Sequence, residues 1–505
     1  MGIGRKGREK DMGEREGRGK DREKAIGEKK EKKEREKVLG GEEMWVKGGG
    51  ERGNKGVGEG EGKSGLGSLH HYLDDHQSLP DNHTSQKVHQ PLPVNTPCLH
   101  HDPITTKMSR RLAEDLGYMK NDSGFFSKAV HEGVSSSKWS HRALVPPVVT
   151  STLFDLSSDE DYFYSRIKNP TRSCLQEALA ATENAKFGVV VSSGQAASSL
   201  VVHLLKTGDH IVAMDDIYAG TNTVLRDIVP RMGIEIDFVD MRDLSYVRKL
   251  LKSNTKLVWI ESPSNPTMKV IDIRALADMV KQHEGILLAI DNTFMSPYFQ
   301  RPLDLGADIV MHSMSKYING HSDVVMGGVV TNREDVYNRL DSLFTTLGPV
   351  PSAFDCYLVL RSLKTLPVRM EQHMMTGLEV ARFLEGHPCV EKVLHPGLPS
   401  HPQHQLSKSQ SFGHSGMFSF YIKGNDLETA KNFLKKLKVF TQATSLGGPE
   451  SLCVHPATIT HQQLPLEERE RYGITAGLIR VSCGLETPAH LTADLDQALR
   501  AAVPY

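Results

Sequence analysis

Short apolar runs alternate with longer stretches of mixed polarity from about Gly124 onward. Seven of these runs have the length of buried strands: 187–193, 210–215, 234–240, 256–261, 286–291, 307–313 and 327–331. Helix-sized segments lie between several of them, such as 273–282, where Ile273, Leu276, Ala277 and Val280 recur at helical spacing. Strands that are apolar along their whole length and separated by helices predict a largely parallel sheet covered on both faces.

The pattern changes after Leu366-Pro367. It then predicts a helix over 369–385, a strand over 417–423, a helix over 426–435 and strands over 439–443 and 478–482. The order is typical of a smaller α+β domain. Residues 124–180 are rich in loop signals, such as Pro146-Pro147 and Asn169-Pro170, and are expected to form an arm.

The predicted fold class is therefore α/β, with a large, mostly parallel seven-stranded sheet domain and a smaller C-terminal α+β domain. We expect four regions: an extension over 1–107, an N-terminal arm over 108–180, the large domain over 181–366 and the small domain over 367–505.

The extension differs in composition from the rest of the chain. Residues 1–63 hold 19 basic and 15 acidic residues, and 19 of the 44 glycines fall within residues 1–67. Such a segment buries too little apolar surface to offset its chain entropy, so we expect it to be disordered. It carries a net charge of +4, which leaves −5 on the remainder because the whole chain carries −1.

Composition also limits the partners. A weakly acidic remainder does not suggest nucleic-acid binding, and no apolar run reaches the ~20 residues that span a membrane. The N-terminus is too acidic for a transit peptide and lacks the apolar region of a signal peptide, so we expect a cytoplasmic protein. The six cysteines are scattered without a CxxC pair, which argues against a metal site and a disulfide framework.

Two groups at successive strand ends indicate a cofactor. Asp291 ends the fifth run, and Lys316 lies three residues after the sixth, between buried-type residues and Tyr317. A carboxylate and an amine so placed fit pyridoxal 5′-phosphate (PLP), because the amine can form a Schiff base and the carboxylate can hold the pyridine nitrogen protonated. Ser313 and Ser315 beside the lysine carry hydroxyls that can bind the phosphate. The alternative is an ordinary surface lysine.

Further strand ends offer contacts for the same cofactor. Gly194 and Gln195 open a helix after the first run, so their backbone N–H groups suit a phosphate, although an ordinary turn has the same pattern. The ring of Tyr218 can stack on a flat cofactor or belong to the core. Asn265 can donate to a phenolic oxygen. Arg480, a guanidinium in an apolar run, predicts a bidentate carboxylate partner.

These segments together resemble a known family. The matching stretches are 164–166 (YSR), 169–172 (NPTR), 192–197 (SSGQAA), 215–218 (DDIY), 291–294 (DNTF), 313–328 (SMSKYINGHSDVVMGG) and 445–448 (SLGG). They resemble the Cys/Met metabolism PLP-dependent enzymes, and within that family the cystathionine γ-lyase branch. The resemblance spans about residues 124–505 and implies fold type I of the PLP-dependent transferases.

The resemblance implies catalytic roles for three residues. Lys316 would carry the cofactor as a Schiff base and move protons during the reaction. Asp291 would pair with the pyridine nitrogen, and Tyr218 would stack on the ring and take part in proton transfer at the leaving sulfur. The residues implied to contact the substrate are Asn265, Ser445 and Arg480, with Asn265 also touching the cofactor phenolate.

The resemblance also implies how the phosphate is held and how the chain assembles. The implied phosphate ligands are Gly194, Gln195, Ser313 and Ser315 of one subunit, with Tyr164 and Arg166 of the neighbouring subunit. The active unit would be a homodimer that shares its sites, usually paired into a homotetramer.

Three positions depart from the family pattern. Lys168 replaces the glycine of the family's GNPTR. Thr223 replaces an arginine and Thr444 replaces a glutamate that the family places near the distal end of cystathionine. Each lost contact to a charged group can be worth ~1.5–3 kcal/mol, so discrimination for cystathionine is expected to fall.

The resulting expectation is a carbon–sulfur lyase of the transsulfuration pathway. It would act by α,γ-elimination on a sulfur amino acid such as cystathionine, and would release hydrogen sulfide if it acts on cysteine or homocysteine. Alternatives are γ-replacement of the cystathionine γ-synthase type and a methionine or homocysteine γ-lyase. An alternative of another class is a catalytically reduced PLP-binding paralogue with a structural or regulatory role, which the losses at Thr223 and Thr444 would favour.

Overall fold

The computed structural model describes residues 112–122, 124–157 and 161–503. The prediction of a disordered extension over 1–107 lies outside these residues, as does Cys98. The other five cysteines are buried free thiols. No helix among the described residues is long and apolar enough to span a membrane.

The larger of two sheets has seven strands, all of them predicted from the sequence: β1 (Phe187–Val191), β2 (His210–Met214), β3 (Glu235–Val239), β4 (Thr255–Glu261), β5 (Leu287–Asp291), β6 (Ile309–Ser313) and β7 (Gly327–Thr331). Their order across the sheet is β1-β7-β6-β5-β4-β2-β3. β7 runs antiparallel to β1 and β6, and the other pairs are parallel, so the mostly parallel sheet is confirmed.

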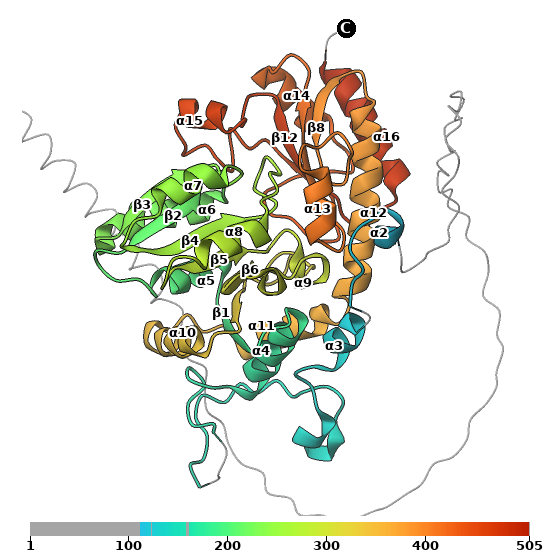
Figure 1. The fold of residues 1–505 in the computed structure, drawn as a ribbon. Helices are drawn as coiled ribbons and strands as arrows, with labels where there is room; N and C mark the ends of the chain where they lie inside the picture. Colours follow the sequence, from blue (N-terminus) through green and yellow to red (C-terminus); the bar gives the residue numbers. More distant parts are fainter. Residues whose placement is uncertain (1–111, 123, 158–160, 504–505) are drawn as a thin grey trace, which may run out of the picture. The chain divides into compact units, whose positions relative to one another are not determined.

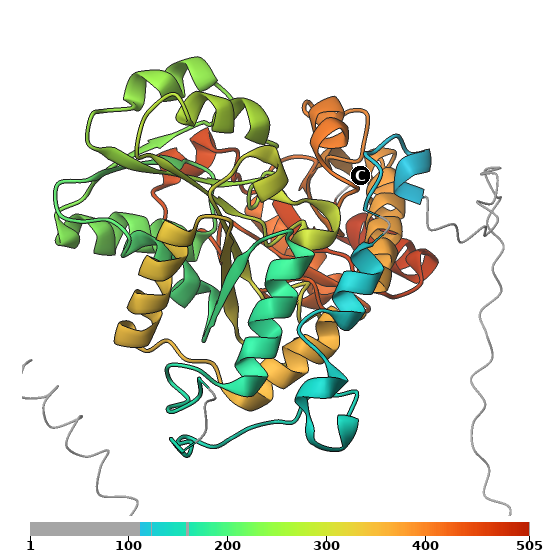
Figure 2. The ribbon, with the colours of Figure 1, turned by 60° about the horizontal axis from the view of Figure 1, so that its bottom comes forward.

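Alternating side chains of β1 enter two different parts of the core, which places helices on both faces of this sheet. Val189 and Val191 pack with α5 (Gly194–Val202) and α10 (Glu334–Leu347). Val190 packs on the other face with α4 (Pro170–Thr182) and α11 (Ala353–Leu363). Figures 1 and 2 show α4 and α11 side by side across this second face.

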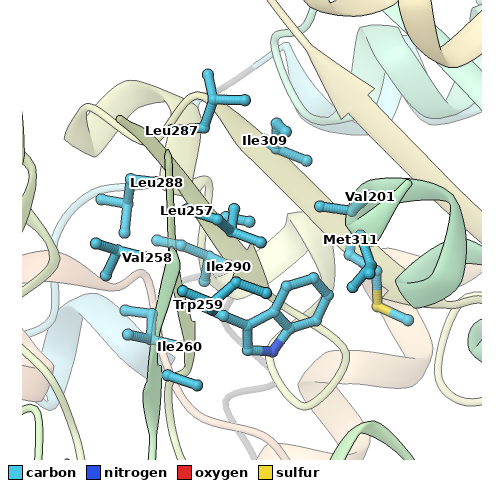
Figure 3. Packing of buried hydrophobic residues seen from close by; sticks show 14 of the residues in the cluster. Val201, Leu257, Val258, Trp259, Ile260, Leu287, Leu288, Ile290, Ile309 and Met311 are labelled. Atoms are coloured by element: carbon cyan, nitrogen blue, oxygen red, sulfur yellow. The ribbon is translucent and has the colours of Figure 1, made fainter. Parts of the chain in front are cut away.

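The core beside the strand ends is built around one large side chain. Trp259 of β4 is fully buried, and it belongs to one cluster with Met311 of β6 and Val201 of α5 (Figure 3). Burying an aromatic ring of this size contributes roughly 1.5–3 kcal/mol or more of transfer free energy. The ends of β4, β5 and β6 are thereby held in a fixed relation.

The second sheet has five strands in the order β10-β11-β12-β9-β8: β8 (Val390–Leu394), β9 (Met417–Ile422), β10 (Thr441–Gln442), β11 (Leu452–Val454) and β12 (Leu478–Ser482). The sequence pattern predicted β9, β10 and β12 but not β8 or β11. In Figure 1 this sheet and its helices occupy the orange to red part of the colour scale. The chain therefore continues after the large sheet into a smaller region that contains both strands and helices.

The remaining helices fill the connections. They are α2 (Leu112–Asp115), α3 (Phe125–His131), α6 (Ala219–Thr223), α7 (Leu244–Leu250), α8 (Ile273–Val280), α9 (Ser296–Phe299), α12 (Leu366–Glu385), α13 (His404–Gln410), α14 (Leu427–Lys436), α15 (Leu466–Arg471) and α16 (Pro488–Ala502). The predicted helices over 273–282, 369–385 and 426–435 correspond to α8, α12 and α14.

Candidate active site

A cavity of about 760 Å³ lies at the carboxyl ends of the central strands. The last residues of β4, β5 and β6 all line it, namely Glu261, Asp291 and Ser313. Ten of the twelve site residues predicted from the sequence line this one cavity: Gly194, Gln195, Tyr218, Asn265, Asp291, Ser313, Ser315, Lys316, Ser445 and Arg480.

Lys316 lies in the turn that follows β6. Its Nζ atom donates to Oγ of Ser445 at 2.6 Å. Burial, with a smaller contribution from the positive charge of Arg480, lowers the pKa of the lysine to about 8. A lysine with such a pKa is partly the neutral amine near neutral pH, which is the form that attacks an aldehyde.

Arg480 is a buried residue of β12 that reaches the same cavity. Its Nη1 atom donates to Oδ1 of Asn265 at 3.1 Å, and its Nη2 atom donates to the Ser445 carbonyl at 2.9 Å. Burial lowers its pKa to about 10, yet the described residues give it no carboxylate partner. A buried guanidinium held by neutral acceptors is a ready binding site for an anionic group.

Two carboxyl groups lie side by side at the floor of the cavity. Asp291 and Glu261 are register partners on β5 and β4. Asp291 accepts the backbone N–H of Thr293 at 2.9 Å, and burial raises its pKa despite this bond. A buried carboxylate without a cation is expensive, and a pyridinium nitrogen would supply the missing positive charge.

The amino end of α5 forms the third wall. Ser193 caps this helix by accepting the N–H of Ala196 at 3.0 Å, while the N–H groups of Gly194 and Gln195 have no acceptor within the helix. A Cβ atom on Gly194 would come within 2.9 Å of the Ser313 side chain, so only glycine fits. The unpaired N–H groups at this helix start suit a phosphate.

The serines beside the lysine differ in availability. The Ser315 hydroxyl donates to the Met326 carbonyl at 3.2 Å and accepts the Met326 N–H at 2.9 Å. Ser313 donates its backbone N–H to Thr293 Oγ1 at 2.8 Å. Its hydroxyl has no hydrogen-bond partner among the described residues, so it is available to a ligand. The combined set of amine, carboxyl and N–H donors fits PLP at its aldehyde, ring nitrogen and phosphate.

Two predicted residues do not line this cavity. Tyr164 forms a bridge with Leu153, and Arg166 donates to the Thr345 carbonyl at 2.5 Å. Both lie in the segment that precedes α4. Their expected place at the site of a neighbouring subunit stays a prediction.

Sequence reasoning missed several polar residues of the cavity lining, among them Glu261, Thr293, Glu450 and Thr460. Glu261 had a readable signal, because it ends β4 with a charge just as Asp291 ends β5. Of the two departures that remove a charge near the distal end of cystathionine, Thr444 lines the cavity. Thr223 does not, and its hydroxyl bonds the Ala219 carbonyl at 3.0 Å.

Comparison with known proteins gives a consistent result. Residues 127–500 match the family described as "Cys/Met metabolism PLP-dependent enzyme". The chain is 51% identical over 400 residues to the cystathionine gamma-lyase of Homo sapiens, covering 79% of this chain and 98% of that protein. The cystathionine gamma-lyase of Dictyostelium discoideum is 46% identical, with 74% and 97% covered.

Solved structures agree. Cystathionine gamma-lyase from Lactobacillus plantarum, complexed with L-serine, is 35% identical with a TM-score of 0.73, covering 76% of this chain and 99% of that one. The metB protein of Corynebacterium glutamicum is 40% identical with a TM-score of 0.72, with 75% and 98% covered. The predicted fold class is confirmed by these likenesses.

Proposed function

The chain belongs to the Cys/Met metabolism PLP-dependent enzymes, and from this membership we propose that it is a carbon–sulfur lyase of the cystathionine γ-lyase type. The observation that carries the proposal is the pairing of a half-buried amine, Lys316, with a buried guanidinium, Arg480, in a cavity that Asp291 also lines. The reaction would be α,γ-elimination, in which cystathionine and water give cysteine, 2-oxobutyrate and ammonia.

The cofactor supplies an aldehyde for the amino group and a ring that withdraws electrons from it. Lys316 would bind the aldehyde of the cofactor, and Asp291 would pair with its ring nitrogen. The N–H groups of Gly194 and Gln195 and the Ser313 hydroxyl would bind its phosphate. Ser315 is supported less, because Met326 already engages its hydroxyl in both directions.

The substrate would be placed by its α-carboxylate. Arg480 donates two N–H bonds, one to Asn265 and one to the Ser445 carbonyl, and both acceptors are neutral. An anionic carboxylate is a stronger partner than either, so it would take their place. The α-carbon of the substrate would then lie on the Lys316 side of the cavity.

Proton movement would fall to Lys316 and Tyr218. The lowered pKa of Lys316, about 8, brings the amine close to working pH, where it can both accept and return a proton. Tyr218 exposes 45% of its surface at the cavity, which supports a role in stacking on the cofactor and in proton transfer at the leaving sulfur.

The cavity is compatible with more than one sulfur amino acid as substrate. Thr444 lines the cavity without a charge where the family has a glutamate, which supports cysteine or homocysteine as additional substrates that would release hydrogen sulfide. γ-Replacement or a methionine γ-lyase activity would use the same residues.

A homodimer that shares its sites is proposed because Tyr164 and Arg166, which match the family's phosphate ligands, lie outside this chain's own cavity. The homotetramer and the cytoplasmic location stay predictions from sequence. Sedimentation of the holoenzyme and cell fractionation would test them.

One assay panel tests the proposed function. The purified holoenzyme is incubated separately with cystathionine, homocysteine, cysteine and methionine, and keto acid, thiol and sulfide are measured. We expect 2-oxobutyrate from cystathionine, and the absence of keto acid from all four would refute the proposal and favour the catalytically reduced paralogue. Lys316→Ala should lose the absorbance near ~420 nm expected of bound PLP, whereas Lys392→Ala, at an exposed lysine on β8, should keep it.

A further inference from the structure

Glu261 is a buried acidic residue of the cavity to which the proposed reaction gives no role. It ends β4, is 5% exposed and lines the cavity. Among the described residues it forms no ion pair. A carboxyl group kept in such a place needs a structural or functional partner to offset its burial.

The partner is the backbone of Tyr218. Both carboxyl oxygens of Glu261 accept the Tyr218 N–H, each at 2.9 Å. This residue directly precedes α6, so its N–H has no acceptor within that helix. Glu261 therefore fixes the chain at the residue whose ring enters the cavity.

The ring itself depends on this backbone position. It folds back over Gly220, where an added Cβ would collide with the Tyr218 ring and with the Gln195 side chain. The Gln195 amide donates to the Gly220 carbonyl at 2.9 Å. Gly220 and Gln195 thus confine the Tyr218 ring on one side. The hydrogen bond from the Tyr218 N–H to Glu261 fixes the backbone that carries the ring, and so sets how far the ring reaches into the cavity.

The far end of the same segment is tied elsewhere. α6 continues into a π-helical turn, Val224–Ile228, in which Arg226 pairs with Glu468 of α15 at 2.8 Å. Wide helical turns of this kind are frequent at functional sites. The segment that carries Tyr218 is therefore held at both ends, and Glu261 supplies the anchor on the cavity side.

We propose that Glu261 is a positioning residue that sets the Tyr218 ring against the cofactor, an inference that rests on the proposed function. Its effect is geometric. Burial, and to a smaller extent the negative charge of Asp291, raise the pKa of Glu261, and a neutral carboxyl still accepts an N–H bond. An uncharged acceptor of the same length therefore keeps the arrangement.

Three substitutions separate geometry from charge. Glu261→Gln keeps an acceptor oxygen at the same reach, Glu261→Met keeps the length but has no acceptor, and Glu261→Asp keeps the carboxyl group but is shorter by one carbon. We expect kcat within about threefold of wild type for E261Q. We expect a loss of about tenfold or more for E261M and E261D, as a misplaced contact group can cause. KM should change little because the carboxylate site at Arg480 is untouched.

A double substitution tests whether Glu261 acts through Tyr218. In the Tyr218→Ala background, adding E261M should lower kcat by no more than about twofold, because the ring it positions is already gone. PLP content and circular dichroism of the bound cofactor are recorded for every holoenzyme, with Glu391→Met, at an exposed strand position, as the matched control.

Wild-type kcat in E261M or E261D, or losses that multiply in the double variant, would overturn the proposal. If E261M does not fold, the contrast between E261Q and E261D decides. Should the wild type turn over no substrate of the panel, the proposed function fails. The cofactor signal would still decide the inference, being unchanged in E261Q and altered in E261M if it is right.

Discussion

The Nζ atom of Lys316 and the Oγ atom of Ser445 are 2.6 Å apart, although 129 residues separate them in the chain. Lys316 follows β6 of the large sheet, whereas Ser445 lies between β10 and β11 of the small one. The backbone around Ser445 fits closely against the lysine, since a Cβ atom on Gly447 would come within 2.8 Å of the Tyr317 nitrogen. The cavity thus depends on the packing of both sheets' loops.

Ser445 adopts a left-handed backbone with φ of 81°, which disfavours residues other than glycine by roughly 1–2 kcal/mol. Ser445→Gly should therefore raise the free energy of unfolding by up to about 1 kcal/mol, after the entropy that glycine itself costs. It should also lower kcat, because Lys316 loses its hydroxyl partner.

Urea denaturation and keto-acid release measure both effects. Ser445→Ala serves as the control, since it loses the hydroxyl but keeps the strained backbone, and should lower kcat without gaining stability. Equal stability of the glycine and alanine variants would contradict the strain.

The pKa of Lys316, lowered to about 8 by burial and by Arg480, predicts a pH dependence for cofactor uptake. The protonated ammonium cannot attack the aldehyde, so the rate of PLP binding to the apoenzyme should rise with pH and have its midpoint near pH 8 rather than near 10.5. The rate is followed by the absorbance near ~420 nm.

Arg480→Leu removes the neighbouring positive charge, which should move this midpoint upward while uptake persists. A midpoint that stays in place would show that burial alone sets the pKa.

Strands were predicted well because their signal is local. β4 and β5 each contain four consecutive apolar residues and then end in Glu261 and Asp291, so consecutive residues indicate both the strand and its functional end. β8 was missed because two exposed charged residues, Glu391 and Lys392, interrupt its apolar pattern. Its position is decided by pairing with β9, which is distant in sequence.

Much of the site was predictable for the same reason. The prediction was incomplete where a contact depends on residues that are distant in the sequence. Lys316, Asp291 and Arg480 stand out by residue type within apolar surroundings. The bond from Glu261 to the Tyr218 backbone joins two strand ends through a main-chain donor, which no side-chain pattern marks. The left-handed Ser445 is likewise a consequence of the packed loop, not of its own propensity.

The uncharged Thr444 of the cavity predicts weak discrimination among sulfur amino acids. Thr444→Glu should raise kcat/KM for cystathionine by roughly tenfold or more relative to homocysteine, because a restored contact with the distal ammonium is worth about 1.5–3 kcal/mol. Thr444→Gln, which restores the length without the charge, should gain much less. Parallel kinetics with cystathionine and homocysteine measure the ratio of the two kcat/KM values. Equal effects on both substrates would argue against a contact between residue 444 and the distal ammonium of cystathionine.

Two buried histidines predict a loss of stability in acid. The rings of His395 and His414 lie 4.4 Å apart, centroid to centroid, and are nearly perpendicular. His395 accepts the Gly397 N–H at Nδ1 (2.9 Å), and its Nε2 and that of His414 have no partner among the residues that the structure describes. Burial lowers the pKa of both rings, that of His414 to about 4. The neighbouring His414 adds to the effect on His395, and Arg382 acts in the same direction on both.

Because the folded pKa of His414 lies below the unfolded value of ~6.5, the unfolded chain binds more protons between pH 6.5 and 4, so stability falls as pH falls through this range. At pH 5 the loss attributable to His414 is about 2 kcal/mol relative to pH 8. His414→Phe keeps the ring volume and removes the titration, so its unfolding free energy should fall about 2 kcal/mol less than that of the wild type between these pH values. Urea denaturation at pH 8 and pH 5 measures this difference.

His490→Phe, at an exposed histidine of α16, serves as the control and should behave as the wild type. If H414F loses as much stability in acid as the wild type, His414 is not a group that resists protonation in the folded state.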